Sequence, residues 1–442
     1  MSSAGSILVR GPGEAGQWAA IALARPLQML MAAPAFLFLL TLSIMLFRPP
    51  DLQFYALDRV ALGLLATVVL LRTLILRRSL RIAGLVTLPL AFITLLALAD
   101  LLSGPYQVQC WSVFAAKWAV PLVLYHLAQL AFCDSLSLQK FETYSLLVLA
   151  YLILMALFFL GSADWLVWPR YILDENLGMH FDRARGPFLQ AVANGVTLNL
   201  RAIIALNSFR RHKLKVPLAI LLLVFLPLAI LATKTRGVWL SFLLSAMLLL
   251  LFSPETRVRR ACGYLLLTTV VGASALLLVA RQSASLSDRL EESSPVEFRL
   301  AVYRTGWEMF REKPLLGWKG ASIRPELSRR IDGFRGREFV FHNSFLEVAV
   351  NHGFFGLALY LWVFLDLLRL GRLRPGAGFA AHSFADAGFR SLWPVMVGVY
   401  ALNACFVVMN YQFVNGLIFT LAGILAAQNR ETAFARETVP CP

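Results

Sequence analysis

Charged residues are scarce in this chain, and the residue patterns that hold metals or nucleotides are missing. Only 15% of the 442 residues are Asp, Glu, Lys or Arg, which is low for a soluble domain of this size. The five cysteines are odd in number and scattered, which argues against a disulfide framework or a cysteine-based metal site. The long polar connections contain no Asp-x-Asp pair, and the chain has no Gly-rich phosphate loop. We therefore expect neither a metal nor a nucleotide cofactor.

Apolar residues, in contrast, dominate the sequence. They make up 59% of it, and the mean hydropathy is +0.69. About twelve runs are long enough to cross roughly 30 Å of hydrocarbon as helices. The fold predicted from these runs is an all-α polytopic membrane protein. The predicted spans are 27–47, 60–76, 82–102, 112–132, 144–161, 188–208, 216–233, 237–252, 262–280, 345–370, 391–410 and 413–427.

The net charge of +16 indicates membrane topology rather than nucleic-acid binding. Lys and Arg gather in alternate short connections, and such clusters mark the cytoplasmic side of a membrane. Both termini are then cytoplasmic, and the long connections 162–187 and 281–344 are translocated. The chain divides into spans 1–9 in 1–280, a large translocated loop at 281–344, and spans 10–12 with a short tail in 345–442. The clusters are Arg77, Arg78 and Arg81; Arg210, Arg211, Lys213 and Lys215; Arg257, Arg259 and Arg260; and Arg369, Arg372 and Arg374.

The loop 281–344 begins with a polar linker at 282–288, and an amphipathic helix is predicted to follow at 296–313. Its apolar residues step by four and three, and Pro314 ends it. Arg299 falls on the predicted buried stripe, so its charge needs an anionic partner. The stripe consists of Val296, Leu300, Tyr303, Trp307 and Phe310, and a basic stretch with Arg324, Arg329, Arg330, Arg335 and Arg337 comes later in the loop.

His342 stands where this loop enters the tenth predicted span. Ser344 and Glu347 match a capping box, so the span is expected to begin just after Asn343 and to point its positive dipole end outward. His342 is a candidate base beside a candidate phosphate site. The simpler interpretation is an interfacial histidine bonded to a carbonyl, and Asn343 can equally orient the imidazole or cap the helix. We read His352, ten residues later, as structural.

Two further arginines come at the outer ends of predicted spans. Arg236 follows Thr235, a candidate helix cap, in the short turn at 233–236, where its guanidinium can form a bidentate contact with phosphate. Arg185 precedes Gly186 and Pro187 at the end of the loop 162–187 and is a candidate for phosphate or for lipid headgroups in general. Asn194 and Asn199 are expected to face the bundle interior, because lipid-facing amides are costly.

Three segments, in this order, resemble the O-antigen ligase superfamily. They are Thr-x-Thr-Arg-Gly at 233–237, Arg299-x-x-x-Tyr303 leading to Pro-Leu-Leu-Gly at 314–317, and His-Asn followed by nine residues, Gly353, two residues and Gly356. The family usually has Trp at the position of Tyr303. The resemblance covers roughly 185–365 by motif and the whole chain by topology.

This resemblance implies a membrane-embedded, GT-C-like glycosyltransferase that is inverting and metal-independent. The donor would be a glycan on undecaprenyl diphosphate, and the acceptor would be the lipid A core oligosaccharide at the periplasmic face of the bacterial inner membrane. Arg236 and Arg299, supported by Arg185 and Asn343, would bind the diphosphate. His342 would accept or orient the proton of the attacking hydroxyl.

Other functions remain open from sequence. An O-antigen polymerase or a protein O-oligosaccharyltransferase uses the same donor, although only about fifteen residues follow 427, which favours the ligase. A polyprenyl-lipid flippase or exporter belongs to a different class. Such a protein needs charged residues at several depths, whereas here Arg201 and Lys117 are the few at membrane depth.

Overall fold

The computed structural model describes residues 34–48, 56–75, 84–280, 294–318, 320–331, 340–372 and 384–437, and within these ranges the regular elements are helices without any strand. This confirms the all-α class. The linker 282–288 and the basic residues Arg77, Arg78, Arg81, Arg335, Arg337 and Arg374 lie outside the described residues.

Helices occupy each of the twelve ranges predicted from hydropathy. Three of them are long and apolar enough to cross a membrane, namely Val108–Ala131, Ser135–Leu160 and Ser344–Arg372, and five more are apolar but shorter. The number of spans therefore stays a prediction. The helices are α2 (Pro34–Leu46), α3 (Leu57–Ile75), α4 (Thr87–Ser103), α5 (Val108–Phe114), the π-helical turn η1 (Ala115–Ala119), α6 (Val120–Ala131), α7 (Ser135–Leu160), α8 (Ala191–Arg210), α9 (Val216–Ala232), α10 (Arg236–Phe252), α11 (Thr256–Ala280), α13 (Ser294–Glu312), α14 (Gly320–Arg330), α15 (Ser344–Arg372), α16 (Ala387–Ala404) and α17 (Gln412–Glu437).

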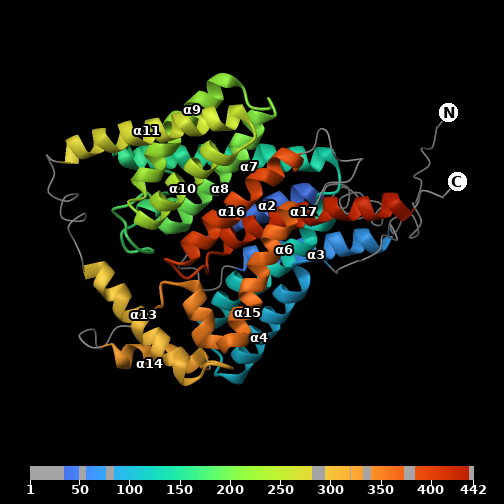
Figure 1. The fold of residues 1–442 in the computed structure, drawn as a ribbon, viewed down its shortest axis with the longest axis vertical. Coiled ribbons are helices and arrows are strands. Elements are labelled where there is room, and N and C mark those ends of the chain that lie inside the picture. The colour runs from blue at the N-terminus through green and yellow to red at the C-terminus, as the bar shows by residue number, and fades with distance from the viewer. Residues whose placement is uncertain are drawn as a thin grey trace, which may run out of the picture.

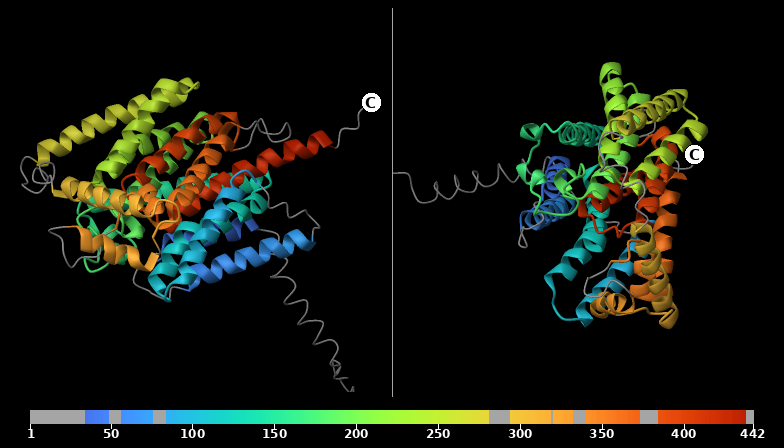
Figure 2. Two further views of the ribbon diagram at one scale, coloured as in Figure 1. Left: turned by 60° about the horizontal axis from the view of Figure 1, so that its bottom comes forward. Right: turned by 90° about the vertical axis from the view of Figure 1, so that its left-hand side faces the viewer.

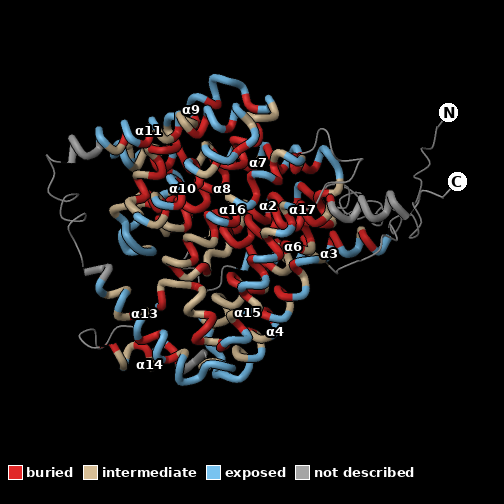
Figure 3. Tube along the Cα trace, in the orientation of Figure 1, coloured by how far each residue is buried: buried red, intermediate tan, exposed pale blue. Residues whose placement is uncertain are grey.

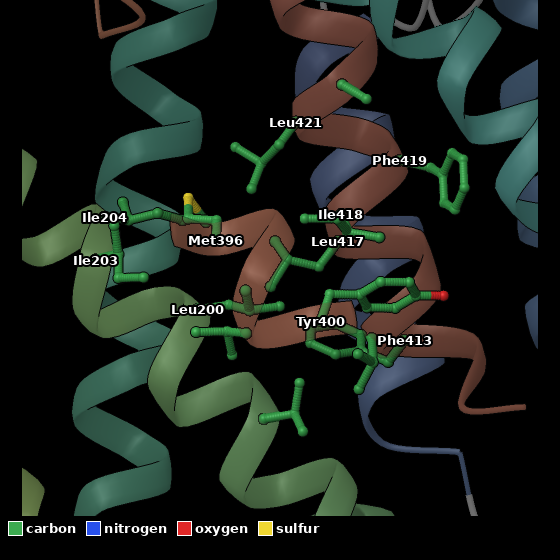
Figure 4. Packing of buried hydrophobic residues seen from close by; sticks show 14 of the residues in the cluster. Leu200, Ile203, Ile204, Met396, Tyr400, Phe413, Leu417, Ile418, Phe419 and Leu421 are labelled. Carbon is green, nitrogen blue, oxygen red and sulfur yellow. The ribbon is translucent and has the colours of Figure 1, made fainter. Parts of the chain in front are cut away.

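The core lies between α8, α16 and α17, where most residues of 191–210, 387–404 and 412–428 are buried (Figure 3). The outer helices α3, α9 and α11 instead expose many Leu, Ile and Val side chains. Apolar residues on both the inside and the outside are expected where lipid replaces water as the solvent. The core contacts shown in Figure 4 come from Leu200, Ile203 and Ile204 of α8, Met396 and Tyr400 of α16, and Phe413, Leu417, Ile418, Phe419 and Leu421 of α17.

The two charged residues predicted at membrane depth are both buried and both have partners. The guanidinium carbon of Arg201 lies 5.2 Å from the ring centroid of Tyr144 and 5.4 Å from that of Phe413. Lys117, in the π-helical turn, donates to the carboxylate of Glu347 in the first turn of α15. Aromatic faces and a carboxylate thus stabilise cations that a low-dielectric bundle would otherwise disfavour.

Helix α15 is a hairpin of two helical arms rather than one straight rod. Gly353, with φ +65° and ψ −159°, breaks it. The ring of Phe345 lies 5.2 Å from that of Tyr360 and 5.3 Å from that of Phe364. A straight helix would hold residues 345 and 360 about 22 Å apart. The predicted span at 345–370 therefore consists of two arms, 344–352 and 354–372, and the second is about 28 Å long.

The connection after α13 fills the break in α15. Phe354 N–H donates to Pro314 O at 2.7 Å and Trp318 N–H donates to Val350 O at 2.8 Å. In an unbroken helix, Phe354 N–H would instead donate to Val350 O, four residues earlier. The approach is close, because a Cβ on Gly353 would lie 2.2 Å from Leu315 O and one on Gly317 2.5 Å from Val350 O. Two motifs far apart in sequence are thus complementary parts of one joint.

Candidate active site

Helix α13 lies beside α15 at one edge of the molecule (Figures 1 and 2), but with a different face buried than predicted. Val302 and Met309 are fully buried, whereas Leu300 and Trp307 of the predicted stripe are 49% and 55% exposed. The prediction took the largest apolar residues as the buried face. Near lipid, such residues can be exposed on the protein surface. The predicted end before Pro314 is confirmed, since the helix stops at Glu312.

Arg299 of α13 acts electrostatically on His342, so two predicted site residues from distant segments lie close together. The pKa of His342 is lowered from its usual value by partial burial, then by the positive charge of Arg299, and further by His180. The ring of Phe298 lies 6.2 Å from the imidazole. Arg299 itself is half-buried. Burial and these two neighbours thus favour the neutral, proton-accepting form of the imidazole.

Tyr303, at the position where the family usually has Trp, fixes the backbone of His342. Its hydroxyl lies 3.1 Å from the carbonyl oxygen of His342 and 3.2 Å from that of Cys405, just past α16. His342 has φ +50°, a left-handed conformation that costs free energy for a residue with a Cβ. The hydroxyl therefore ties a strained backbone position to two neighbouring helices.

The predicted capping box at the start of α15 does not form. Asn343 is the cap, and its Oδ1 accepts from the N–H groups of Phe345 at 2.9 Å and Leu346 at 3.0 Å. Ser344 instead donates to Val407 O and accepts from Met409 N–H, and Glu347 bonds Lys117. The capping alternative for Asn343 is confirmed. Its oxygen also occupies two of the N–H donors that an anion would use at this helix end.

Arg236 is the first residue of α10 and is exposed. Thr235 is at the N-cap position as predicted, but its hydroxyl donates to Thr233 O at 2.8 Å, so the predicted side-chain cap is wrong. The following Gly237 lies against Phe406, which is 3.3 Å from where its Cβ would be. Because Cys405 precedes Phe406 and is within reach of Tyr303, the start of α10 belongs to the same neighbourhood as His342.

Arg185 is fully buried and its guanidinium binds backbone. It donates to the carbonyls of Ile172, at 3.0 Å, and of Asp174 and Leu177. Burial lowers its pKa, and the carboxylates of Asp174 and Glu175 act in the opposite direction. In this structure Arg185 organises the loop before α8. Its part in diphosphate binding stays a prediction.

The interior placement of Asn194 and Asn199 is confirmed, as both side chains are buried. Asn194 Nδ2 donates to Ala184 O at 2.8 Å, and Asn199 accepts from Ser245 at 3.2 Å. Asn194 therefore holds the chain next to Arg185, which links α8 to the loop that carries this arginine.

His180 is a neighbour of the candidate site that sequence reasoning missed. It lies in the loop 162–187 and has φ +56°, and its charge acts on His342. The available signal was a second histidine in the other long loop that was predicted to be translocated. Its position beside His342 depends on the folding of both loops, which spacing along the chain does not reveal.

Among proteins of known families, the model described as O-antigen ligase matches residues 219–361. This match, over about a third of the chain, supports the resemblance to the O-antigen ligase superfamily. The matched region contains Arg236, Arg299, His342 and Asn343, whereas Arg185 lies before it. The match supports, at a coarse level, an enzyme of the ligase or polymerase type that acts on lipid-linked polysaccharide. No curated protein matched the chain.

Proposed function

We propose that the protein is an O-antigen ligase that transfers a glycan from undecaprenyl diphosphate to the lipid A core oligosaccharide, with inversion and without a metal. The observation that carries this proposal is the pair of His342 and Arg299 inside the family region, where a neutral imidazole lies beside a cation. A base and an anion-binding group at one place are what glycosyl transfer from a diphosphate requires.

In this proposal Arg299 and Arg236 bind the diphosphate and stabilise its negative charge as it leaves, with Asn343 and Arg185 in support. Arg236 has a suitable position, because it is exposed at a helix N-terminus without a side-chain cap. His342 accepts or orients the proton of the attacking sugar hydroxyl. Since a diphosphate is already a good leaving group, holding both substrates in place supplies much of the rate.

We also propose where the protein is located and how it is oriented in the membrane. The protein spans the bacterial inner membrane several times, both termini lie in the cytoplasm, and the site opens at the periplasmic face. The alternate loops with Lys and Arg clusters support this orientation. Its partners are the lipid-linked glycan, the lipid A core and membrane lipids.

Transfer by purified protein tests the assignment. Arg299→Ala and Arg236→Ala are each expected to lower the rate roughly a hundredfold or more, because charge on the leaving group loses its stabilisation. Arg304→Ala, which removes an exposed arginine of the same helix, is the matched control and retains activity. The assay contains lipid-linked glycan and lipid A core without nucleotide or added metal. Near-normal transfer by both site variants would remove the diphosphate assignment.

The acceptor is decided by the same assay with separate arms. Transfer to lipid A core supports the ligase, whereas growth of the lipid-linked chain itself identifies a polymerase, and a glycosylated peptide identifies a protein O-oligosaccharyltransferase. Movement of the lipid across the bilayer without a new glycosidic bond identifies a flippase.

A further inference from the structure

Four large apolar side chains stand exposed around the joint between α13 and α15. Leu315 and Leu316 are 61% and 75% exposed, and Phe354 and Phe355 are 58% and 54% exposed. The bond from Phe354 N–H to Pro314 O brings the two pairs together. Such a group is costly to leave in water, at about 25 cal/mol for each Å² of apolar surface, and marks a contact surface.

These residues continue a stripe on the second arm of α15. Phe354, Leu361 and Leu365 are exposed and spaced by seven and four, and Phe355 and Trp362 repeat the spacing of seven beside them. Residues at this spacing share one face of a helix. The arm 354–372 is long enough to cross the hydrocarbon, so its exposed apolar face is the lipid-facing one. Leu315 and Leu316 follow Pro314, which bonds Phe354, and so lie next to the first residues of that face.

The helix that leads into the turn has the composition of an interfacial element. Leu300, Arg304, Trp307 and Arg311 follow one another by four, three and four, and all are exposed. Trp and Arg are typical of the boundary between headgroups and acyl chains. Next to the turn, Lys313 Nζ lies 3.8 Å from the ring centroid of Trp318. Cationic and aromatic groups thus lie on both sides of Leu315 and Leu316 in the sequence.

We propose that the turn at Leu315 and Leu316, together with Phe354 and Phe355, is inserted among the hydrocarbon chains of the membrane leaflet. The connection between α13 and α14 is then a re-entrant element, and the loop predicted as translocated is anchored in lipid. Backbone in hydrocarbon needs internal partners, and part of the backbone around this turn has them. Gly317 N–H donates to Lys313 O at 3.1 Å, Trp318 and Phe354 donate within the joint, and Pro314 has no N–H.

This anchor bears on the candidate active site. α13 ends at the turn and carries Arg299 and Tyr303 on its earlier part, and both act on His342. The depth of the turn in the leaflet therefore sets the height at which these residues meet a substrate whose own anchor is a lipid. The proposal itself depends on exposure and packing alone.

Fluorescence quenching in lipid nanodiscs tests the insertion. Leu316→Cys is made in a full-length chain without other cysteines and labelled with an environment-sensitive nitrobenzoxadiazole dye. Arg329→Cys on α14 is the matched control, since the Arg329 side chain is 76% exposed and belongs to the same loop. Quenchers are phosphatidylcholine with dibrominated acyl chains and aqueous iodide. The cysteines replaced are Cys110, Cys133, Cys262, Cys405 and Cys441.

The label at position 316 is expected to lose most of its fluorescence in brominated lipid and little to iodide, with the opposite pattern at position 329. Phe354→Cys, labelled in the same way, is expected to follow position 316. Iodide quenching of positions 316 and 354 at the level of position 329 would overturn the proposal. So would a label that neither quencher reaches, because protein would then cover the turn.

Discussion

At the scale of single residues, the surroundings of His342 decide what this side chain can do. Its pKa is lowered by burial and by neighbouring positive charge, so the neutral imidazole dominates at pH 7. Because the folded pKa lies below the unfolded one, protonation also destabilises the folded protein as the pH falls through this range. The acid limb of a pH–rate profile is therefore expected below pH 6.5, the ordinary value for histidine.

His180→Gln tests this electrostatic coupling. The substitution removes a positive charge that develops near His342 in acid, so the pKa of His342 rises and the acid limb moves toward neutral pH. The rate on the plateau is retained, because His180 has no proposed part in the chemistry. The profile of transfer rate against pH checks this. His212→Gln, at a histidine that contacts Arg257, is the control, and an equal shift there would contradict the coupling.

At the scale of elements, the hairpin of α15 depends on one glycine. Gly353 combines a positive φ with a backbone contact from Leu315, and the chain 314–318 supplies the hydrogen-bond partners that the break leaves free. A residue with a Cβ meets both strain and collision at this position. Gly353 and Gly317 belong to different sequence motifs, and both are needed because the two backbone segments approach each other closely in this joint.

Gly353→Ala is expected to destabilise the protein by upward of about 2 kcal/mol, since backbone atoms cannot move aside as a side chain can. The measurement is the apparent melting temperature in detergent, followed by size-exclusion chromatography. Gly398→Ala in α16 is the control. Nothing lies within 4 Å of its Cβ position, so the helix gains about 0.5–1 kcal/mol from the lost chain entropy. Equal stability of the two variants would contradict the role given to Gly353.

Helix positions followed from the sequence because apolar runs and breakers act locally. Pro314 ended α13 as predicted. The buried face of α13 could not be predicted from the sequence. Leu300 and Trp307 are apolar, and apolar residues can contact either protein or lipid. The cap at Asn343 was one of two local possibilities, and the bonds of Ser344 to Val407 and Met409 decided between them. The position of His180 near His342 could not be predicted either, because it depends on how two separate loops fold.

At the scale of the whole molecule, one ion pair connects two parts of the bundle. Lys117 lies in the π-helical turn between α5 and α6, and Glu347 lies five residues after His342. Both side chains are largely withdrawn from solvent. Loss of one partner leaves an uncompensated charge, which typically costs about 3–5 kcal/mol. The pair therefore couples the placement of the first arm of α15 to the helices around η1.

A double-mutant cycle measures this coupling. Lys117→Met and Glu347→Leu are each expected to lower the apparent melting temperature strongly, and the double variant is expected to be more stable than either single variant. The reason is that the double variant buries no unpaired charge. Strictly additive effects of the two substitutions would show that the residues do not interact.

The hydrogen bonds from Arg185 to three carbonyl groups fix the conformation of the loop before α8. This loop is also joined to the end of α9, because Ala184 N–H donates to Ala232 O at 3.0 Å. A loop that is hydrogen-bonded at both points keeps its conformation when no ligand is bound. Ordering a mobile loop on association usually consumes binding free energy. In the proposed function, this pre-organisation lowers the entropic penalty of binding the lipid-linked donor.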